Sequence, residues 1–567
     1  MAYFLKKSTL KGRTYISICE SFYSHSKKGT AHRTYKSLSS VETQIANGIK
    51  DPISYYQKEV DELNKETISK KDIQIGNESP LKYLGYFPIA SILNDLEIKK
   101  YINYYKLTTD YVFDLYDLLK SLIYARSVNP CSKYKTFHEV MPSLFESINL
   151  SYDQLLDGLS FYGNEYEKIV ELFTSQVNKK YKIDTSTTYF DCTNFYFEID
   201  REDDFRRKGP SKENRKDPIV GLGLLLDKNQ IPIGMKMYPG NQSEKPVLRD
   251  IIDDLKKQNN IKGKTIHVAD KGLNCSENIF KSISNHDGYL FSKSIKTLPE
   301  IEKTWVLLEN DYKYVTNSNG EIHYKYKSCI DEFTYYYKDQ FGKRKEVKVK
   351  EKRLVTYNPS LASKKKYEIN KLVEKAKILR NSEAKKSEYG DAGKYISFES
   401  VNEDGTSSNK KAKVSINQDA IDKDLRLAGY NLLITSELKM SDIDIYNTYH
   451  NLWRIEESFR IMKSDLDARP VFVQKEESIK GHFLICYLTV LLERIFQFHV
   501  LKNKYGTAEI FKFIKNFKVV KANNDEYINV SVLNDFIREL RDITSLPLTN
   551  YILSETKIKK VLNYNFK

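Results

Sequence analysis

The spacing of hydrophobic residues changes from a helical to a strand pattern near residue 184. Between 80 and 180, apolar residues recur at the three- and four-residue spacing of amphipathic helices, as in YDLLKSLIYARSV and YEKIVELFTSQVNKKY. From 184, β-branched and aromatic residues gather in the runs TSTTYFDCTNFYFE, IVGLGLLLD and IPIGMKMYPGN, which predict three strands. The chain is therefore expected to pass from a helical region into a sheet.

The runs that follow complete an α/β pattern. A Ser-Glu cap begins a predicted helix at Ser243 to Lys257, and TIHVAD predicts a short strand. A helix is expected from Cys275 to Asn285, and a further strand at GYLFSKS. Three strands, a helix, and then alternating strand and helix are typical of an α/β fold with a mixed sheet. After an interruption, the pattern resumes with the strand GYNLLITS and a long helix from about Asp442 to Asp465.

These changes of pattern divide the chain into six predicted regions. The interruption holds an alternating run typical of an antiparallel sheet, followed by a Lys-rich stretch, so we expect a mostly β insertion within the core. In order, the regions are a basic β-rich module (1–75), a helical region (76–183), the first part of the core (184–295), a basic insertion (296–428), the second part of the core (429–503) and an α-rich tail (504–567).

The charge of the chain is positive and unevenly distributed. The formal net charge is +15, and residues 341–390 alone carry sixteen Lys and Arg against six Asp and Glu. A surplus of this kind suits a polyanionic partner, because neutralised phosphates release counterions. Lys364, Lys365 and Lys366 are therefore candidate DNA contacts, and the helical region 76–183 is a candidate DNA-binding domain. The alternative interpretation is a solvated charged face in a Lys-rich proteome.

Cysteine spacing and hydropathy narrow the class of protein. The six cysteines are scattered without a CxxC pair, which argues against a zinc site or a disulfide framework and fits a reducing cytoplasm. No long apolar run follows the first charges, so no signal peptide is expected. The most apolar stretch, Phe483 to Leu492, is about half the roughly 20 residues that a membrane span needs. We therefore expect a cytoplasmic protein without a membrane partner.

Three acidic residues lie at positions suited to chemistry. Asp191 lies inside the first strand, where an isolated buried carboxylate would be costly unless it is paired, solvated or bound to metal. Asp270 ends the strand TIHVAD, and open α/β sheets place their sites at the carboxyl ends of strands. Glu456 lies on the long helix. Each acid taken alone is also compatible with a structural role.

The long helix carries a mixed polar stripe. Tyr449, Glu456 and Lys463 are spaced by seven residues, so all three are expected on one face of a regular helix. Trp453 and Arg460 flank that stripe. An acid, a base and a phenol on one face suit the binding of a metal ion together with a phosphate. The alternative is an amphipathic helix with ordinary surface ion pairs.

Three sequence blocks resemble the DDE transposases of the IS-four superfamily, especially its IS-1634-like branch. They are YFDCTNFYFE, HVADKGLNCSENI and YHNLWRIEESFRIMKSDLDARPVFVQKEESIKGHFLICYL. The signature of that family is Tyr, two residues, Arg, three residues, Glu, six residues, Lys, and here Tyr449, Glu456 and Lys463 fall in register. Leu452 occupies the Arg position, and Arg454 and Arg460 are both candidates for the missing cation.

The resemblance implies a ribonuclease-H-like catalytic core and a set of functional residues. Asp191, Asp270 and Glu456 would hold two Mg²⁺ ions, for which Mn²⁺ is expected to substitute. Double-stranded DNA, as element terminal inverted repeats and as target, would be bound near residues of the same helix, namely Tyr449, Trp453, Arg454, Arg460 and Lys463. Family members act as a homodimer on paired ends, in the bacterial cytoplasm at the nucleoid.

Such a protein would be an insertion-sequence transposase that cleaves element ends and transfers strands into target DNA. A related DNA nuclease that does not join strands would carry the same acids. A DNA-binding regulator or an inactive relic of a transposase is a further alternative, although mere binding does not require three carboxylates directed at a phosphate.

Overall fold

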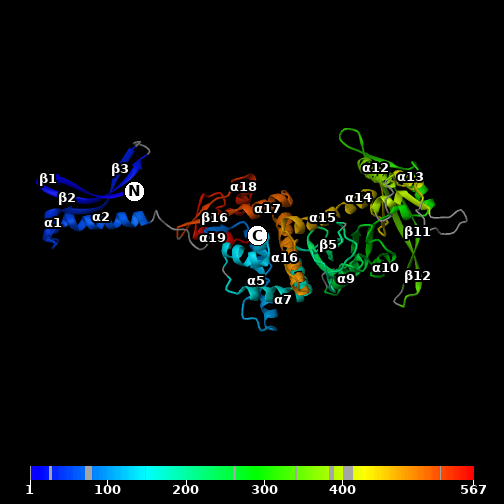
Figure 1. Cartoon of the computed structure of the whole chain (residues 1–567), viewed down its shortest axis with the longest axis horizontal. Coiled ribbons are helices and arrows are strands. Elements are labelled where there is room, and N and C mark those ends of the chain that lie inside the picture. Colours follow the sequence, from blue (N-terminus) through cyan, green and yellow to red (C-terminus); the bar gives the residue numbers. More distant parts are fainter. Residues whose placement is uncertain are drawn as a thin grey trace. The chain divides into compact units, whose positions relative to one another are not determined.

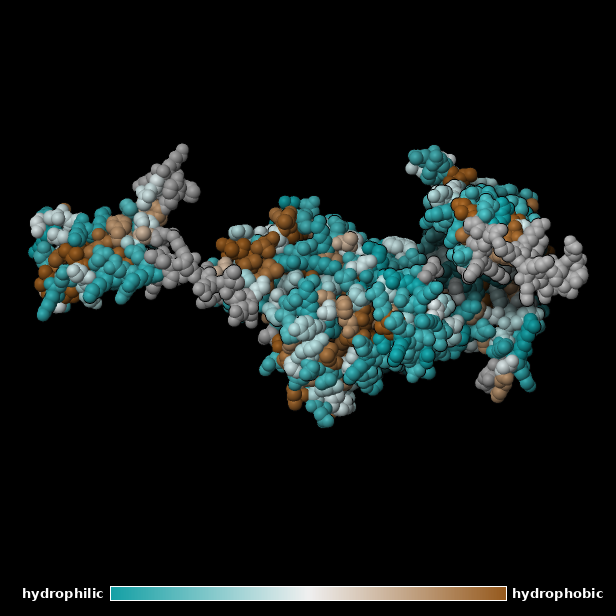
Figure 2. Space-filling view, viewed as in Figure 1, coloured by the Kyte–Doolittle hydropathy of each residue, from teal (hydrophilic) through white to brown (hydrophobic). Residues whose placement is uncertain are grey.

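A computed structural model of the chain describes residues 2–24, 29–69, 79–146, 148–213, 215–258, 263–338, 341–381, 388–399, 413–523 and 525–566. The structure separates into two compact units, Met1–Ser79 and Pro80–Lys567, and each is described by itself (Figure 1). Figure 2 shows hydrophilic residues over most of the visible face of the second unit, with hydrophobic residues gathered in separate patches.

The first unit is an antiparallel sheet covered by helices. Its strands follow the order β1-β2-β3, and two helices complete it: β1 (Ala2–Leu10), β2 (Arg13–Ser24), β3 (Gly29–Ser40), α1 (Val41–Ala46) and α2 (Pro52–Ser69). Ile16, Ile18 and Leu38 of the sheet pack with Tyr56 and Val60 of α2 in a small core. The run TYISICESFYSHSKKGTAHRTYKSL predicts two short strands around a Lys-Gly turn. These strands are β2 and β3, while β1 and the helices were not predicted. Part of the predicted Lys-Gly turn lies outside the described residues.

The second unit begins with helices that pack around one long apolar helix. The helices are α3 (Phe87–Asp95), α4 (Lys99–Lys106), α5 (Leu115–Val128), α6 (Lys133–Lys135), α7 (Tyr152–Asn164) and α8 (Tyr166–Tyr181). Both helices predicted from the spacing are confirmed, as α5 and α8. The apolar helix, α16 (Glu476–Ile495), packs against α5, α7 and β7.

The length of this apolar helix exceeds that of its most apolar run. Within the described residues, the stretch Glu476–Val500 is long and apolar enough to cross a membrane, but 83% of its most apolar window is buried inside the protein. Its hydrophobic surface is thus covered by the neighbouring helices and by the sheet, as expected of a core helix.

The largest sheet of the second unit has nine strands in the order β10-β11-β12-β15-β9-β8-β5-β6-β7. One half consists of β5 (Thr187–Tyr196), β6 (Ile219–Leu226), β7 (Pro232–Pro239), β8 (Ile266–Ala269) and β9 (Gly288–Lys293). In that half, β5, β6 and β7 pair antiparallel, whereas β5, β8 and β9 pair parallel. The connecting helices are α9 (Glu244–Lys257) and α10 (Ser276–Ser284). The predicted mixed α/β sheet is confirmed.

The other half of the sheet comes largely from the segment that interrupts the core pattern. Its strands are β10 (Lys313–Thr316), β11 (Ile322–Lys338), β12 (Arg344–Tyr357) and β15 (Tyr430–Thr435). They pair antiparallel, and β15 pairs antiparallel with β9. The strands of the insertion therefore continue the core sheet.

The prediction that the insertion is mostly β is wrong, because it also contains substantial helix. Its helices and remaining strands are α11 (Glu300–Leu307), α12 (Pro359–Asn381), the 3-10 helix η5 (Gly390–Tyr395), β13 (Ile396–Glu399), β14 (Lys413–Ile416) and α13 (Gln418–Arg426). The Lys-rich stretch forms much of α12, whose buried positions are Ala362, Ile369, Val373 and Ala376. Four small or branched residues among many lysines give only a weak helical period.

The predicted single helix from Asp442 to Asp465 is interrupted. It forms α14 (Asp442–His450), α15 (Trp453–Arg460) and a π-helical turn (Ile461–Asp465). The N–H groups of Leu452, Arg454 and Ile455 donate to carbonyls three residues earlier, so the backbone tightens between α14 and α15. Hydrophobic spacing does not show such shifts, because it records which side chains are buried and not which carbonyl each N–H reaches.

The tail contains a sheet as well as helices, so its prediction as simply α-rich is incomplete. Its elements are α17 (Thr507–Asn516), β16 (Lys518–Asn523), β17 (Glu526–Asn529), α18 (Asp535–Thr544), β18 (Ile552–Ser554) and α19 (Glu555–Leu562). The sheet order is β18-β17-β16-β4, in which β4 (Leu81–Tyr83) comes from the start of the second unit. The strands are only three to six residues long, which makes them hard to detect from alternation.

Candidate active site

Asp191 and Asp270 lie side by side on neighbouring parallel strands. The register pairs Phe190 of β5 with Ala269 of β8, and each acid is the next residue along its chain. Adjacent strands lie about 4.8 Å apart, so this register places two carboxylates at one point of the sheet edge. Residue 270 also follows the carboxyl end of β8, where open sheets place their functional groups.

The side chain of Asp191 shares a sheet face with two residues of the large hydrophobic core. Tyr189 and Phe195, which alternate in phase with Asp191 along β5, belong to that core, and the Phe195 ring lies 4.6 Å from the Phe483 ring of α16. The intervening Phe190 and Cys192 belong to the core on the opposite face. Since α15 packs against β5, the acid points toward the face on which α15 lies.

Tyr449 connects this helical region directly to the acids. Its hydroxyl donates a hydrogen bond to Asp270 Oδ1 at 3.0 Å. Burial, and then the charge of Asp270, raises the pKa of Tyr449 well above its usual value, so the phenol remains a neutral donor. The structure thus brings together Asp191, Asp270 and Tyr449 from three separate predicted elements.

Lys212 and Glu244 also lie at the acids, and the sequence analysis did not identify either as a site residue. The Lys212 ammonium lies 3.6 Å from Asp191 Oδ1 and 3.8 Å from Glu244 Oε1, and donates to the Cys192 carbonyl. Glu244 is the first residue of α9, and a Cβ placed on Gly272 would lie 4.0 Å from Glu244 Oε2. Glu244 was recognised only as part of a helix cap, and Lys212 lies in a loop without periodicity.

The local environment disfavours the charge on Asp191. Burial raises the pKa of Asp191 to about 6, and the charges of Glu244 and Asp270 act in the same direction. Lys212 and the N–H of Cys192, which donates to Asp191 Oδ1 at 2.8 Å, oppose the increase. A cation placed among these carboxylates would relieve the repulsion between them.

An open cavity of about 530 Å³ lies beside the acids. Lys212, Glu244 and Gly272 line it, together with Asn194 of β5 and the turn from Gly240 to Ser243. The Asn194 amide is held by a hydrogen bond to the Pro210 carbonyl at 3.1 Å. The cavity therefore reaches Lys212, whose ammonium lies 3.6 Å from Asp191.

Lys463 lies near the other end of β5. Its ammonium is 5.3 Å from the centre of the Phe195 ring and 3.4 Å from Glu213 Oε1. Arg469 binds the same Glu213 at 2.6 Å. Burial lowers the pKa of Lys463, while Glu213 opposes that effect. Tyr449 and Lys463 thus lie at different points along β5 and its neighbour, with α15 between them in the chain.

The adjacent glutamates of α15 have different environments. Glu456 is exposed and forms no hydrogen bond or ion pair with the described residues. Glu457 is 11% exposed and binds Arg454 at 3.2 Å, Arg460 at 3.6 Å and the fully buried Arg494 of α16 at 3.0 Å. Glu457 therefore anchors α15 to α16.

The remaining predicted residues of this helix lie near its solvent side. Trp453 is 48% exposed, and the Arg454 guanidinium lies 3.9 Å from the centre of its ring. Arg460 is 53% exposed and donates to Thr507 at 3.1 Å. Both arginines that could replace the cation absent at Leu452 are thus engaged with Glu457.

The fit of a divalent metal can be judged from the donors present. Asp191, Asp270 and Glu244 offer the oxygen ligands that Mg²⁺ prefers, and the Lys212 ammonium already places a positive charge between two of them. Within the described residues, no group of three or more His, Cys, Asp or Glu is close enough to hold a metal ion. The two aspartates fit a metal by the chemistry of their oxygens, but together with Glu456 they do not form such a group within the described residues.

The family model for the transposase DDE domain matches residues 186–492, which is more than half of the 567-residue chain. The chain belongs to the DDE transposase family. The match includes β5, β8 and α15, and hence both aspartates and Glu456. No curated protein matches the chain. Membership of the transposase family places the chain in a class of enzymes that act on DNA.

The DNA-binding lysines predicted for this transposase lie on the surface of the insertion. Lys364, Lys365 and Lys366 are all exposed on α12, and Lys365 binds Glu368 at 2.8 Å. The buried face of α12 packs through Ile369 and Val373 against Tyr395 and Ile421. The three lysines are therefore free of any role in that core.

Replacing Lys364, Lys365 and Lys366 together with glutamine is expected to weaken DNA binding and flatten its salt dependence. Each lost phosphate contact should reduce the slope of log affinity against log salt by about 0.9. A titration at several salt concentrations would measure this slope. The matched control is the triple change to glutamine at Lys557, Lys559 and Lys560, exposed lysines of α19. Equal slopes for the two variants would show that the α12 lysines form only a solvated face.

Proposed function

We propose that this chain is an insertion-sequence transposase that cleaves DNA at the ends of its element and transfers the freed strand into target DNA. The observation that supports the proposal most strongly is the pair Asp191 and Asp270, adjacent on parallel strands, with Tyr449 hydrogen-bonded to Asp270 at 3.0 Å. A binding protein has no need of two repelling carboxylates at the edge of a sheet.

We further propose that the core is ribonuclease-H-like. The strand order β9-β8-β5-β6-β7 supports this proposal. Strands β5, β6 and β7 form an antiparallel meander, β8 pairs parallel with β5, and β9 pairs parallel with β8. Along the chain, Asp191 lies in the first of these five strands, and Asp270 directly follows the fourth, β8. Placement in the IS-four superfamily and its IS-1634-like branch rests on the blocks around Asp191, Asp270 and Tyr449.

Asp191, Asp270 and Glu456 are proposed as the ligands of two Mg²⁺ ions, with Mn²⁺ as a substitute. When bound, such ions activate the attacking oxygen and stabilise the leaving oxygen of an in-line displacement at phosphorus. Tyr449 would keep Asp270 oriented through its hydrogen bond. Glu456 lies on a helix that packs against β5, and its carboxylate has no competing partner within the described residues.

The other side chains of this helix are proposed to hold DNA. Lys463 offers a cation beside the strand that carries Asp191, and Trp453 offers an exposed ring for packing against the substrate. Arg454 and Arg460 remain alternative sources of the signature cation, although both are shared with Glu457. The substrate would be double-stranded DNA with terminal inverted repeats, held by a homodimer that acts after the two ends are paired.

The proposal is tested by incubating the purified protein with a plasmid that carries its gene and the flanking DNA. We expect cleavage at the element ends and joined products with Mg²⁺ or Mn²⁺, and neither when a chelator is present. Gel analysis of labelled ends would follow both steps. Cleavage without joining would identify a nuclease, and binding to the ends without cleavage would identify a regulator or an inactive relic. Either outcome would contradict the proposed function.

A further inference from the structure

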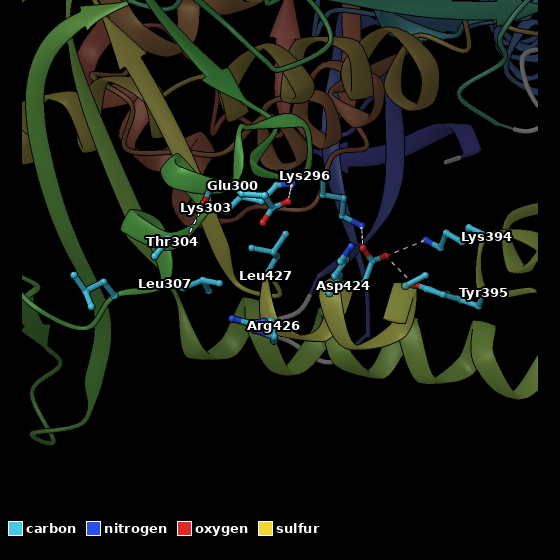
Figure 3. Close-up of a pocket in the computed structure, with 13 residues that line it drawn as sticks. Lys296, Glu300, Lys303, Thr304, Leu307, Lys394, Tyr395, Asp424, Arg426 and Leu427 are labelled. Atoms are coloured by element: carbon cyan, nitrogen blue, oxygen red, sulfur yellow. Dashed lines mark hydrogen bonds and ion pairs between the residues drawn. The ribbon is translucent and has the colours of Figure 1, made fainter. Parts of the chain in front are cut away.

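A second cleft lies in the insertion, apart from the residues of the candidate active site. It has a volume of about 640 Å³ and is bordered by α11 and the residues just before it on one side, and by η5 and α13 on the other (Figure 3). This size is typical of sites that enclose a small ligand. None of the acids or helix residues assigned to DNA cleavage lines it.

Part of the lining of this cleft is apolar, and this part is called its floor below. Leu307 and Leu308 of the α11 side, Leu427 and Ala420 of the α13 side, and the buried ring of Tyr395 line it. Leu308 is 51% exposed, so apolar surface faces the open space. A ligand with a flat or apolar part could cover that surface and remove it from water.

The rim of the cleft is strongly positive. Its lining includes five cationic side chains, Lys296, Lys303, Lys394, Lys423 and Arg426, against the two carboxylates of Glu300 and Asp424. An excess of three positive charges around one cleft attracts an anion and raises its local concentration. An apolar floor below a cationic rim suits a ligand that combines an apolar body with phosphate.

Asp424 fixes one side of this rim. It accepts hydrogen bonds from Lys296 at 2.5 Å and from the Tyr395 hydroxyl at 2.9 Å, and Lys394 lies 3.8 Å away (Figure 3). Although partial burial acts in the opposite direction, these partners lower the pKa of Asp424. The carboxylate therefore stays charged and holds two lysines at the entrance, with one positive charge left uncompensated.

Glu300 lies on the other side of the cleft rim. Its carboxylate is 82% exposed and accepts a hydrogen bond from Lys303 at 3.0 Å. Lys303, followed by the more distant Lys423 and Arg426, lowers the pKa of Glu300. An exposed carboxylate among three cations occupies the kind of position that a phosphate would take, and it would compete with an incoming anion.

We propose that this cleft binds a segment of single-stranded DNA, with a base and its sugar on the apolar floor and the adjoining phosphates at Lys303, Lys423 and Arg426. The assignment of DNA as the ligand rests on the proposed function. A cleft of this volume admits individual nucleotides, whereas a duplex would reach only its rim.

The test uses the full-length protein and a fluorescently labelled oligodeoxythymidine of about 12 nucleotides, within the range that single-strand sites cover. Lys423→Glu combined with Arg426→Glu should weaken binding by about tenfold or more at low salt, because two phosphate contacts become repulsive. Both side chains are exposed on α13, and circular dichroism would confirm that the variant is folded.

Glu300→Gln should change the affinity for the oligonucleotide in the opposite direction. Removing the competing carboxylate should tighten binding by about two- to fivefold, as expected for one exposed charge. The matched control is Glu374→Gln on α12. Glu374 is 65% exposed and binds Lys377 at 2.8 Å with the same i,i+3 spacing, but it lies outside the cleft. This control should leave the affinity unchanged.

Three results would overturn the inference. Equal affinities for Glu300→Gln and Glu374→Gln would show that the cleft takes no anion. Equal binding of a duplex would show that single strands are not selected, and full competition by thymidine monophosphate at equal nucleotide concentration would indicate a site for free nucleotides.

The binding test of the cleft and the cleavage test of the proposed function can fail independently of each other. Asp191→Asn, which removes a carboxylate of the candidate active site, should bind the oligonucleotide like the unchanged protein. A protein that shows the Glu300→Gln effect but cleaves no DNA would contradict the proposed function alone. A protein that cleaves its element ends but shows no such effect would contradict the cleft alone.

Discussion

Asp191→Asn is expected to reduce DNA cleavage by about a thousandfold while leaving DNA binding intact. Metal-ion catalysis supplies several kcal/mol of transition-state stabilisation, and each 1.4 kcal/mol is about tenfold in rate. Asparagine has nearly the volume of aspartate, but it cannot supply the negative charge that would hold a divalent cation beside Asp270. The same loss is expected for Asp270→Asn.

The same substitution should stabilise the metal-free fold. The pKa of Asp191 is raised from 3.8 to about 6, so the charged carboxylate costs the folded state free energy above pH 6, on the order of 1–3 kcal/mol. Because the folded-state pKa lies above the unfolded one, this cost is complete above about pH 6 and disappears below about pH 4. The stability advantage of Asp191→Asn should therefore shrink by about half between pH 8 and pH 5.

Cleavage time courses and thermal unfolding at the two pH values would measure both effects. Mg²⁺ should raise the unfolding temperature of the unchanged protein and not that of Asp191→Asn. The control is Asp253→Asn, which removes a carboxylate on α9 that binds Lys281 at 2.9 Å, away from the candidate active site. Cleavage by Asp191→Asn at the rate of this control would refute the assignment of Asp191.

The adjacent glutamates of α15 should separate catalysis from stability. Glu456→Gln is expected to lose cleavage by orders of magnitude and to unfold at the same temperature, because Glu456 is exposed and has no partner among the described residues. Glu457→Gln is expected to keep cleavage per folded molecule and to lose about 3 kcal/mol of stability. The substitution removes the carboxylate that is paired with the fully buried Arg494 at 3.0 Å.

Cleavage rates and denaturant unfolding of the two variants, each compared with the unchanged protein, would decide this. If Glu457→Gln abolished cleavage while Glu456→Gln remained active, the register carried over from Tyr449 and Lys463 would be wrong. The spacing of seven residues places Tyr449, Glu456 and Lys463 on one face only if the helix is regular. The tightened turn at Leu452 and the π-helical turn at Ile461–Asp465 change the rotation between these residues.

Much of the fold could be predicted because its signals are local. Alternation and β-branched residues identified β5, β6 and β7, and a Ser cap identified the start of α9. Asp191 and Asp270 were recognised as candidates because a carboxylate within or at the end of an apolar strand is unusual wherever that strand finally packs. The family resemblance rested on the same segments, and its coarser part, membership of the DDE transposases, is confirmed over residues 186–492.

Other features depend on contacts between residues distant in the chain, which no local spacing records. Glu244 and Lys212 reach Asp191 only when α9 and the loop before β6 fold over the edge of the sheet. The sequence indicates no structural role for Glu457, whereas in the structure Glu457 accepts a hydrogen bond from Arg494, which lies thirty-seven positions later in the chain. The cleft of the insertion is likewise lined by α11 and α13, and the hydrogen bond from Lys296 to Asp424 joins residues 128 positions apart.

The sequence alone therefore determined the order of strands and helices from β5 to β9, the basic surplus and the two candidate aspartates, since each depends on residue type and near neighbours. Only the tertiary structure decided that the strands of the insertion join the core sheet and that the helix carrying Glu456 is interrupted. It also decided which charges meet at each site. These outcomes follow from hydrogen-bond pairing, burial and charge compensation between distant segments, which are properties of the packed chain.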